Sequence, residues 1–363
     1  MECFEMAGIV QSTQAYESWL RGQLGADLVE GDLLRKHMKM RSSSFSFLRA
    51  TYWRFSETVL DICPDAAAAP KVLAIGDTHL ENFGTWRDVE GRLVWGANDF
   101  DDAAVMPYAL DLIRLTASAL LAVTEGGPPA QTIAASVLGG YLRALQTPTS
   151  VILERDHKWL RKALTLPDSE RRAFWDKFAS LAPSEKPAPS AYTEALDASL
   201  PSGHAAYIPK PRTAGTGSLG RPRFIAYTDW RGGPVLREAK AMLQSAWSLA
   251  HAPDDRAIHA VEIATGQMRS PDQHYRLIGS VLVRRLSPSS TKIEIDGNSD
   301  LLLSPDMLDL MGFEIGNCHA NDPAAVDAIL RDLKARKPGW LVEDAKATAA
   351  QIGAEQKTWS HAS

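Results

Sequence analysis

Two short acidic clusters constrain the fold of this chain more than any other feature of its sequence. Asp77 to Asn82 follow the short apolar run 72–75. Asp99 to Asp102 likewise follow a strand-like run, at 92–95. Short apolar runs bounded by polar turns are typical of buried strands, so we expect both clusters at the ends of neighbouring strands. So many carboxylates close together would repel one another without a cation. The sequence therefore predicts a cation site where these strands end.

The spacing within the clusters matches that of phosphoryl-transfer sites. Such sites place a hydroxyl-orienting Asp first, a metal-binding Asn five residues later and a second metal-binding Asp beyond it. Asp77, Asn82 and Asp99 follow this order. Magnesium prefers oxygen ligands and retains waters, so few protein ligands suffice when substrate phosphates supply the rest. We predict that Asp77 is the catalytic residue, as the base or the carboxylate that orients the substrate, and that Asn82 and Asp99 are metal ligands, with Asp101 as an alternate ligand. Alternatively, these residues only shape turns. His79 is expected to brace the loop backbone.

A glycine-rich segment forms the second constellation. It has the pattern Gly-x-Gly-x-x-Gly, but Pro222 and the apolar run 224–227 indicate a following strand rather than the helix of a dinucleotide site. A strand, a glycine-rich turn and another strand suit a flap over nucleotide phosphates, which backbone amides can approach closely. The alternative is a flexible loop. The predicted nucleotide-binding residues of this segment are Gly215, Thr216, Gly217, Ser218 and Gly220.

Basic residues beyond this loop are candidates for the cation that contacts the α- and β-phosphates. Arg237 has the expected position and Lys240 follows it closely. Arginine and lysine are not equivalent at such a site, so the identity of this cation stays open. Glu262 is the candidate acid that orients the cation, although a lone Glu on a helix is usually solvated. Arg284 and Arg285 are expected to be surface charges rather than anion contacts.

Composition limits the classes of partner and location. The 363 residues are 45% hydrophobic and 23% charged, as in an ordinary globular protein. The net charge of -5 gives no basic footprint, so no nucleic-acid partner is expected. No apolar stretch is long enough for a bilayer, so no membrane contact is expected. The three cysteines, Cys3, Cys63 and Cys318, have neither metal-type spacing nor a disulfide framework, which favours a cytoplasmic protein. The oligomeric state is left open.

The chain divides into three segments by composition and periodicity. Residues 1–204 are expected to be mainly helical and to carry the catalytic and metal loops within 71–115. A stretch rich in Pro, Ser and Ala at 181–212 marks the boundary to a β-rich segment at 205–298. Residues 299–363 return to helical periodicity. The candidate strands of the middle segment are 223–228, 234–237, 281–286 and 292–295. These expectations make the fold class α+β.

These motifs resemble those of the kinase-like small-molecule phosphotransferases, such as aminoglycoside and choline kinases. The resemblance rests on Gly76 to Asn82 and Asp99 to Asp102. Over most of its length the chain also resembles the bacterial family known as domain of unknown function 2252. The matching segments are Ser44 to Arg49, Gly76 to Gly84, Asn98 to Asp101, Asp111 to Leu115 and Gly215 to Gly220. That family typically has Lys-Glu-Ala where this chain has Arg237-Glu238-Ala239. The resemblance implies a protein-kinase-like fold of two lobes, with a small β-rich nucleotide lobe and a larger helical lobe.

The order of the motifs is reversed relative to an ordinary kinase, because the glycine loop follows Asp77 instead of preceding it. A circular permutation would reconcile the two orders, and it is physically tolerable because domain termini are often exposed and close together. Leu310 to His319 would then resemble the helix that precedes the catalytic loop. The sequence thus predicts an ATP- and magnesium-dependent phosphotransferase with a small-molecule acceptor.

Three alternatives remain open from the sequence. Arg237 in the usual lysine position suggests a non-catalytic, nucleotide-binding pseudokinase. The side chains of Asp77, His79, Asp99 and Asp101 suggest a metal-dependent hydrolase with two metals. Transfer of a nucleotidyl group would need the same metal and phosphate contacts as phosphoryl transfer.

Overall fold

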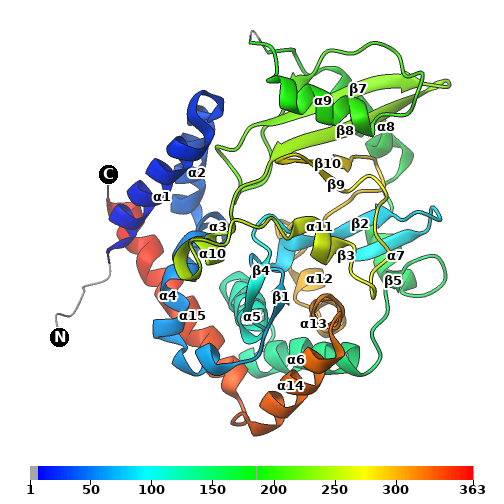
Figure 1. Cartoon of the computed structure of the whole chain (residues 1–363). Coiled ribbons are helices and arrows are strands. Elements are labelled where there is room, and N and C mark those ends of the chain that lie inside the picture. The colour runs from blue at the N-terminus through cyan, green and yellow to red at the C-terminus, as the bar shows by residue number, and fades with distance from the viewer. Residues whose placement is uncertain (1–6, 185, 363) are drawn as a thin grey trace.

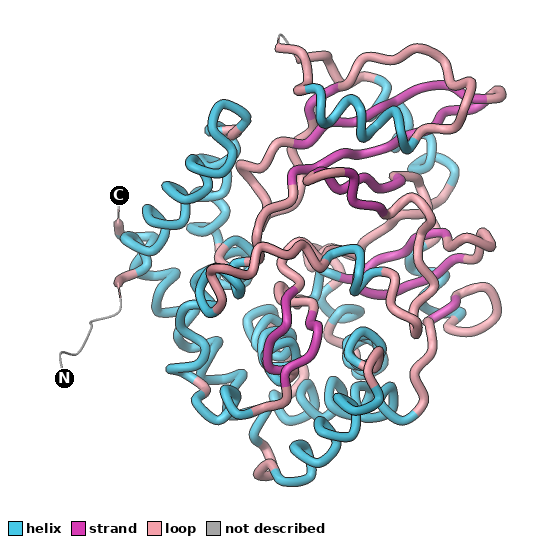
Figure 2. Tube along the Cα trace, viewed as in Figure 1, coloured by secondary structure: helices cyan, strands magenta, loops and turns pink. Residues whose placement is uncertain are grey.

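Helices make up most of the structure, and three small sheets lie among them (Figures 1 and 2). The computed structural model describes residues 7–184 and 186–362, and every count below refers to those ranges, so Cys3 lies outside them. The predicted α+β class is confirmed. Cys63 and Cys318 are buried free thiols. In the described ranges no helix is both long and apolar enough to cross a membrane.

The helices build one large core because their apolar residues recur at helical spacing and face inward. They are α1 (Ile9–Leu24), α2 (Glu30–Ser42), α3 (Ser44–Ala50), α4 (Tyr52–Ile62), α5 (Ala109–Ala122), α6 (Ala130–Gln146), α7 (Lys158–Leu164), α8 (Asp168–Ala179), α9 (Ser190–Ser199), α10 (Ala246–His251), α11 (Ala260–Ala264), α12 (Ser299–Leu302), α13 (Pro305–His319), α14 (Pro323–Ala335) and α15 (Trp340–His361). The last long helix, α15, packs on α5, and α13 packs on α6 (Figure 1). Helices from both ends of the chain therefore share this core.

Helix α13 crosses α6 at unusually short range. Gly140 of α6 faces the backbone of Asp309, and Gly312 of α13 faces the backbone of Val137. A Cβ atom at either glycine would overlap the facing carbonyl oxygen. The two helices can approach this closely only because both positions lack a side chain.

Two antiparallel strand pairs bring the acidic clusters together. Strand β1 (Lys71–Ala74) pairs with β4 (Ala104–Pro107), and β2 (Phe83–Arg87) pairs with β3 (Leu93–Ala97), which also pairs with the short β5 (Val151–Ile152). In the β2–β3 hairpin Phe83 lies opposite Ala97, and the Asn98 amide donates to the Asn82 carbonyl at 3.2 Å. The first cluster ends and the second begins at this point, so the register of one hairpin sets their proximity.

The third sheet has five strands in the order β6-β7-β8-β10-β9. They are β6 (Lys210–Pro211), β7 (Arg223–Trp230), β8 (Gly233–Ala241), β9 (Arg276–Ile278) and β10 (Val281–Arg285). Helix α9, within the predicted helical segment 1–204, packs on one face of this sheet through Tyr192 and Leu196 (Figure 1). The opposite face carries Glu238 and Lys240, which point toward the acidic clusters. The strand period of two separates these residues from Arg237 and Ala239.

One predicted strand differs from the structure. Residues 292–295 do not form a strand, since only Lys292 makes an isolated bridge, to Gly84. Within the segment predicted to be mainly helical, Thr165 to Pro167 separate α7 from α8. Proline at 167 supplies no amide hydrogen for a continuing helix.

Candidate functional site

The loop that carries Asp77 is fixed by the start of α5. The buried carboxylate of Asp111 accepts hydrogen bonds from the amides of Ile75 (2.8 Å) and Gly76 (2.9 Å). Gly76 has a φ of 87°, and a Cβ there would overlap the Asp102 carbonyl oxygen. His319 of α13 contacts the same Asp111 carboxylate at 3.1 Å. The backbone just before Asp77 is therefore held by Asp111 of α5, which His319 of α13 supports in turn.

The Asp77 side chain is oriented by a buried arginine. Arg114 donates to Asp77 Oδ1 from Nε (2.9 Å) and Nη2 (2.5 Å), and its guanidinium lies over the rings of Tyr52 and Phe55. Burial raises the pKa of Asp77 above its ordinary value, although the Arg114 guanidinium opposes this. The other oxygen, Oδ2, faces the glycine loop, since a Cβ on Gly217 would lie 3.3 Å from it. Asp77 thus presents one oxygen to whatever binds beneath that loop.

Asn82 connects the two acidic clusters. Its Nδ2 donates to the carbonyl oxygens of Asp77 (3.0 Å) and Asp99 (3.1 Å). Its Oδ1 is buried and accepts no hydrogen bond from the described residues. Buried polar atoms are almost always satisfied, so an exception points to a missing water, ion or ligand. His79 Nδ1 accepts from the Glu81 amide at 3.2 Å, which agrees with the predicted bracing of the loop.

A buried lysine bridges the second cluster to the five-stranded sheet. Lys240 of β8 forms ion pairs with Asp99 Oδ1 (3.2 Å) and with Asp101 Oδ1. Burial alone would raise the pKa of Asp99, but the Lys240 ammonium and other nearby cations hold it well below its ordinary value. Asp101 Oδ2 accepts no hydrogen bond from any residue that the structure describes, and it lies 3.9 Å from Arg223. Asp99 is therefore ionised, and both carboxylates lie around the single positive charge of Lys240.

These oxygen atoms suit a magnesium ion whose remaining ligands are supplied by the phosphates of a substrate. The unpartnered Asn82 Oδ1 and the ionised Asp99 are of the ligand types that magnesium prefers. Within residues 7–184 and 186–362, no three His, Cys, Asp or Glu side chains are grouped so that they could hold a metal ion. A metal here would consequently depend on the Asn82 amide and on oxygens from a ligand.

The glycine loop is held over Asp77 by helix α2. Lys36 Nζ donates to the Gly217 carbonyl at 2.8 Å, and Lys39 Nζ donates to Thr216 Oγ1 at 3.1 Å. The Val29 amide, just before α2, donates to the Gly220 carbonyl at 3.0 Å. No local pattern in the sequence predicts this contact, because residues about 180 positions apart meet here.

Lys36 makes the stability of the folded protein depend on pH. Burial, aided by Arg221, lowers the pKa of Lys36 to about 7, whereas an unfolded lysine titrates near 10.4. Between these values the unfolded chain binds more protons than the folded one, so this residue makes the free energy of unfolding rise with pH. Between pH 7 and 9, the free energy of unfolding of the wild type should rise relative to that of Lys36→Met by up to about 1.4 kcal/mol per pH unit. Urea denaturation of both proteins at pH 7, 8 and 9 measures this difference, and parallel profiles would contradict it.

Apart from Gly220, the predicted residues of the acidic clusters and of the glycine loop line one cavity of about 620 Å³. Its walls include Asp77, Asn82, Asp99, Asp101 and the loop residues 215–218. Seven cationic side chains also line it, namely Arg49, Lys177, Arg212, Arg221, Arg223, Arg284 and Lys292. Six carboxylates line it too, namely Asp77, Glu81, Asp99, Asp101, Asp102 and Glu294. The cavity is thus densely charged with both signs, and its cations supply the local positive charge that an anionic ligand needs.

Gly220, Lys240, Arg237 and Glu262 do not line this cavity. Gly220 lies at the end of the loop against Leu33, and Lys240 lies behind the two carboxylates it binds. Arg237 projects from the other face of β8, where it donates to the Ser199 carbonyl at 3.2 Å. Glu262 is exposed on α11, and its carboxylate lies 2.7 Å from His259 Nδ1. The structure therefore separates Arg237 and Glu262 from the phosphate-type site.

A buried acid that the sequence analysis missed organises the sheet side of the cavity. Glu238 is fully buried and forms ion pairs with Arg212, Arg223 (3.0 Å) and Arg284 (2.7 Å). Burial would raise its pKa, but these guanidinium groups hold the pKa well below its ordinary value. The expectation that Arg284 is a surface charge is wrong. Its position next to Glu238 follows from the pairing of β10 with β8.

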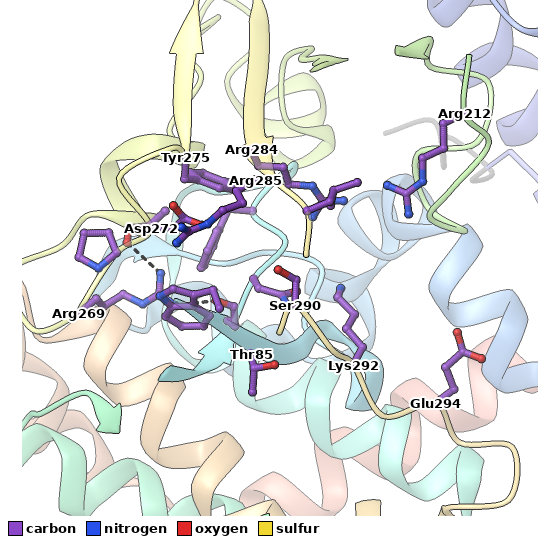
Figure 3. Close-up of a pocket in the computed structure, with 17 residues that line it drawn as sticks. Thr85, Arg212, Arg269, Asp272, Tyr275, Arg284, Arg285, Ser290, Lys292 and Glu294 are labelled. Carbon is purple, nitrogen blue, oxygen red and sulfur yellow. Dashed lines mark hydrogen bonds and ion pairs between the residues drawn. The ribbon is translucent and has the colours of Figure 1, made fainter. Parts of the chain in front are cut away.

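A second cavity of about 280 Å³ adjoins the first (Figure 3). Its walls combine aromatic and apolar side chains, which include Trp86, Phe100, Tyr275 and Leu286, with charged ones such as Arg269 and Asp272. We call it the aromatic cavity. Four residues line both cavities, namely Arg212, Arg284, Lys292 and Glu294. The aromatic cavity therefore leads into the charged one through residues that the two share.

Comparison with known proteins gives one match. The model of a family described as an uncharacterized protein conserved in bacteria (DUF2252) matches residues 28–162. No curated protein and no solved structure matches the chain. The matched stretch contains helix α2, both acidic clusters, Asp111 and Arg114. Over this part of its length the chain is similar to an uncharacterised bacterial family.

Proposed function

We propose that this protein is an ATP- and magnesium-dependent phosphotransferase that acts on a small-molecule hydroxyl acceptor. One observation carries the proposal. The Asp-x-x-x-x-Asn segment, the following Asp and the glycine loop come from distant parts of the sequence, yet they line a single cavity. Phosphoryl transfer depends mainly on positioning and on charge stabilisation, and these are the parts that it requires.

Asp77 is proposed to accept the proton that the acceptor hydroxyl loses as it takes the terminal phosphoryl group. Its Oδ1 is committed to Arg114, whereas Oδ2 faces the cavity side of the glycine loop. The upward shift of its pKa favours proton acceptance, because a base works best when its pKa approaches the working pH. The amides of residues 215–218 would bind phosphate oxygens above it.

Asn82 and Asp99, with Asp101 as a neighbouring carboxylate, would hold magnesium. When bound, magnesium would neutralise phosphate charge and align the phosphate chain. Lys240, which the sequence suggested as a phosphate contact, would instead keep Asp99 ionised and hold Asp99 and Asp101 in place. The nucleobase would occupy the aromatic cavity, where flat rings are stabilised by apolar contact.

The reversed motif order supports a kinase-like arrangement whose sequence is circularly permuted. The five-stranded sheet with its glycine loop would be the nucleotide lobe, and the helices from both ends of the chain would form the other lobe. Helices α1 and α15 pack together, and Arg41 Nη2 donates to the Ala362 carbonyl at 3.4 Å. Helices from the first and last parts of the described chain thus pack together, which is compatible with a permuted order.

Nucleotide binding is tested by thermal shift with ATP and magnesium. Saturation at about 100 times the Kd should add about 2.7 kcal/mol to the stability of the wild type. For a chain of this size that corresponds to a rise in Tm of several degrees. Asp99→Ala should lose the magnesium-dependent part of this rise, whereas Asp156→Ala, which alters an exposed ion pair, should keep it. If wild type shows no shift with ATP and magnesium, the nucleotide assignment is wrong.

Transfer itself is tested by the mass of the product formed from a panel of hydroxyl metabolites. The expected gain is one phosphate, and Asp77→Asn should slow the reaction by about 100-fold or more, since a positioned base contributes at least this much. A product heavier by a nucleoside monophosphate would show nucleotidyl transfer instead. The pseudokinase alternative predicts ATP binding with no product from any acceptor. Its motive in the sequence was Arg237, whose side chain contacts α9 rather than the cavity.

A further inference from the structure

Lys292 projects from a segment that is fixed against the catalytic hairpin. The Thr85 amide donates to the Thr291 carbonyl at 2.9 Å, and the Thr291 amide donates to Thr85 Oγ1 at 3.0 Å. Gly84 faces the Lys292 stem, and a Cβ there would lie 3.0 Å from Lys292 Cγ. The lysine is therefore placed by the same β2 strand that begins after Asn82. Contacts with β2 therefore fix the position of Lys292 relative to the acidic clusters.

The ammonium of Lys292 has no partner among the described residues. It forms no hydrogen bond and no ion pair there, although it lies close enough to Asp99 to interact with its charge. The neighbouring cations are committed, because Lys240 binds two carboxylates and three arginines share Glu238. Lys292 thus offers a charge that the protein itself does not use.

Lys292 also stands at the junction of the two cavities. Lys292 lines the aromatic cavity, where Figure 3 shows it. It also lines the larger cavity beneath the glycine loop. A nucleotide with its base among Trp86 and Tyr275 and its terminal phosphates beneath the glycine loop would bring its first phosphate past this point. An ammonium is a compact charge with three donors, which suits a phosphate oxygen.

We propose that Lys292 binds the phosphate nearest the nucleoside, the α-phosphate, and so supplies the contact that the sequence had led us to expect from Arg237. This inference rests on the proposed function, because it assumes that the two cavities bind one nucleotide. It assigns different tasks to the two lysines of the site. Lys240 orders the metal-binding carboxylates, and Lys292 meets the nucleotide.

The test compares adenosine, AMP, ADP and ATP by calorimetric titration in the presence of magnesium. The proteins are wild type, Lys292→Met, Lys292→Arg and the control Lys162→Met, which alters an exposed lysine of α7. In wild type the affinity should rise from adenosine to AMP. Lys292→Met should lose about 10- to 100-fold of that rise and leave adenosine binding unchanged, as expected for a charged hydrogen bond. Lys292→Arg should recover part of the loss, and Lys162→Met should match wild type.

The outcomes separate this inference from the proposed function. If wild type binds none of the four ligands, both are wrong. If wild type binds them and Lys292→Met keeps the full rise from adenosine to AMP, the inference is wrong while the nucleotide site stands. Equal loss of adenosine and AMP binding in both Lys292 variants would mean that the residue only supports the cavity wall, and this result also overturns the inference.

Discussion

Gly140→Ala is expected to lower the free energy of unfolding by about 1–3 kcal/mol or more. The added methyl group would overlap the carbonyl oxygen of Asp309, which belongs to the backbone of α13 and cannot swing aside. Relief requires the two helices to separate, and their contact is central to the helical core. Urea denaturation with far-UV circular dichroism measures the loss. Gly312→Ala, the reciprocal change on α13, should have a similar effect.

The neighbouring residue provides a matched control. Gly139 is exposed on the same helix, and the nearest atom to a Cβ there is Asp309 Oδ1 at 4.0 Å, an ordinary contact distance. Gly139→Ala should therefore raise the free energy of unfolding by about 0.5–1 kcal/mol, because alanine favours the helical backbone more than glycine does. If both alanine variants were stabilised, the close approach of α6 and α13 would be wrong.

Arg114→Met should destabilise the protein by about 3 kcal/mol. The change removes the partner of a largely buried carboxylate, and breaking buried ion pairs in this way typically costs 3–5 kcal/mol. We expect the lower end because 20% of the Asp77 side chain is exposed. The methionine keeps apolar contact with Tyr52 and Phe55, so the lost charge dominates the effect.

A double variant distinguishes the lost charge from lost packing. In Arg114→Met, the further change Asp77→Asn should restore part of the stability, since no buried charge then remains unpaired. Arg155→Met, which breaks an exposed pair with Asp156, should change stability by no more than about 0.5 kcal/mol. If Asp77→Asn instead destabilised Arg114→Met further, the pairing of Arg114 with Asp77 would not explain the loss.

The fold class and the meeting of the two acidic clusters were predictable because both depend on local signals. Apolar runs bounded by turns mark β1 and β3, and each cluster directly follows its strand. A hairpin joins neighbouring segments of sequence, so the approach of Asn82 to Asp99 needs no distant partner. The roles of these residues in phosphoryl transfer stay predictions.

Which basic residue meets the acidic clusters was harder to predict, because it depends on the face of the strand to which each side chain points. Arg237 and Lys240 differ by three positions, so they lie on opposite faces of β8. Helical spacing would have put them on one face, and the sequence around them does not show which applies. Only the register with β7 and β10, in which Lys240 lies opposite Arg223 and Leu282, determines the face that meets the acids.

Two further features could not be predicted from the sequence, for another reason. They are the contact of α2 with the glycine loop and the partners of Glu238. Lys36 and Gly217 are brought together by the whole arrangement of the core and sheet, and nothing in either segment signals the other. Glu238 occurs in the ordinary run Arg-Glu-Ala-Lys, and its three arginines come from separate segments. Such networks become visible only when the tertiary structure is known.

The shared helical core has a consequence for synthesis of the chain. Helices α5 and α6 leave the ribosome long before α13 and α15, which cover them. A nascent chain would therefore hold both acidic clusters and the complete five-stranded sheet while the apolar faces of α5 and α6 still lacked their partners. The sheet and α9 lie within 190–285, so they are suited to fold first, and the helical part must wait for the last sixty or so residues. Chaperone contact should then concentrate on α5 and α6 during this interval.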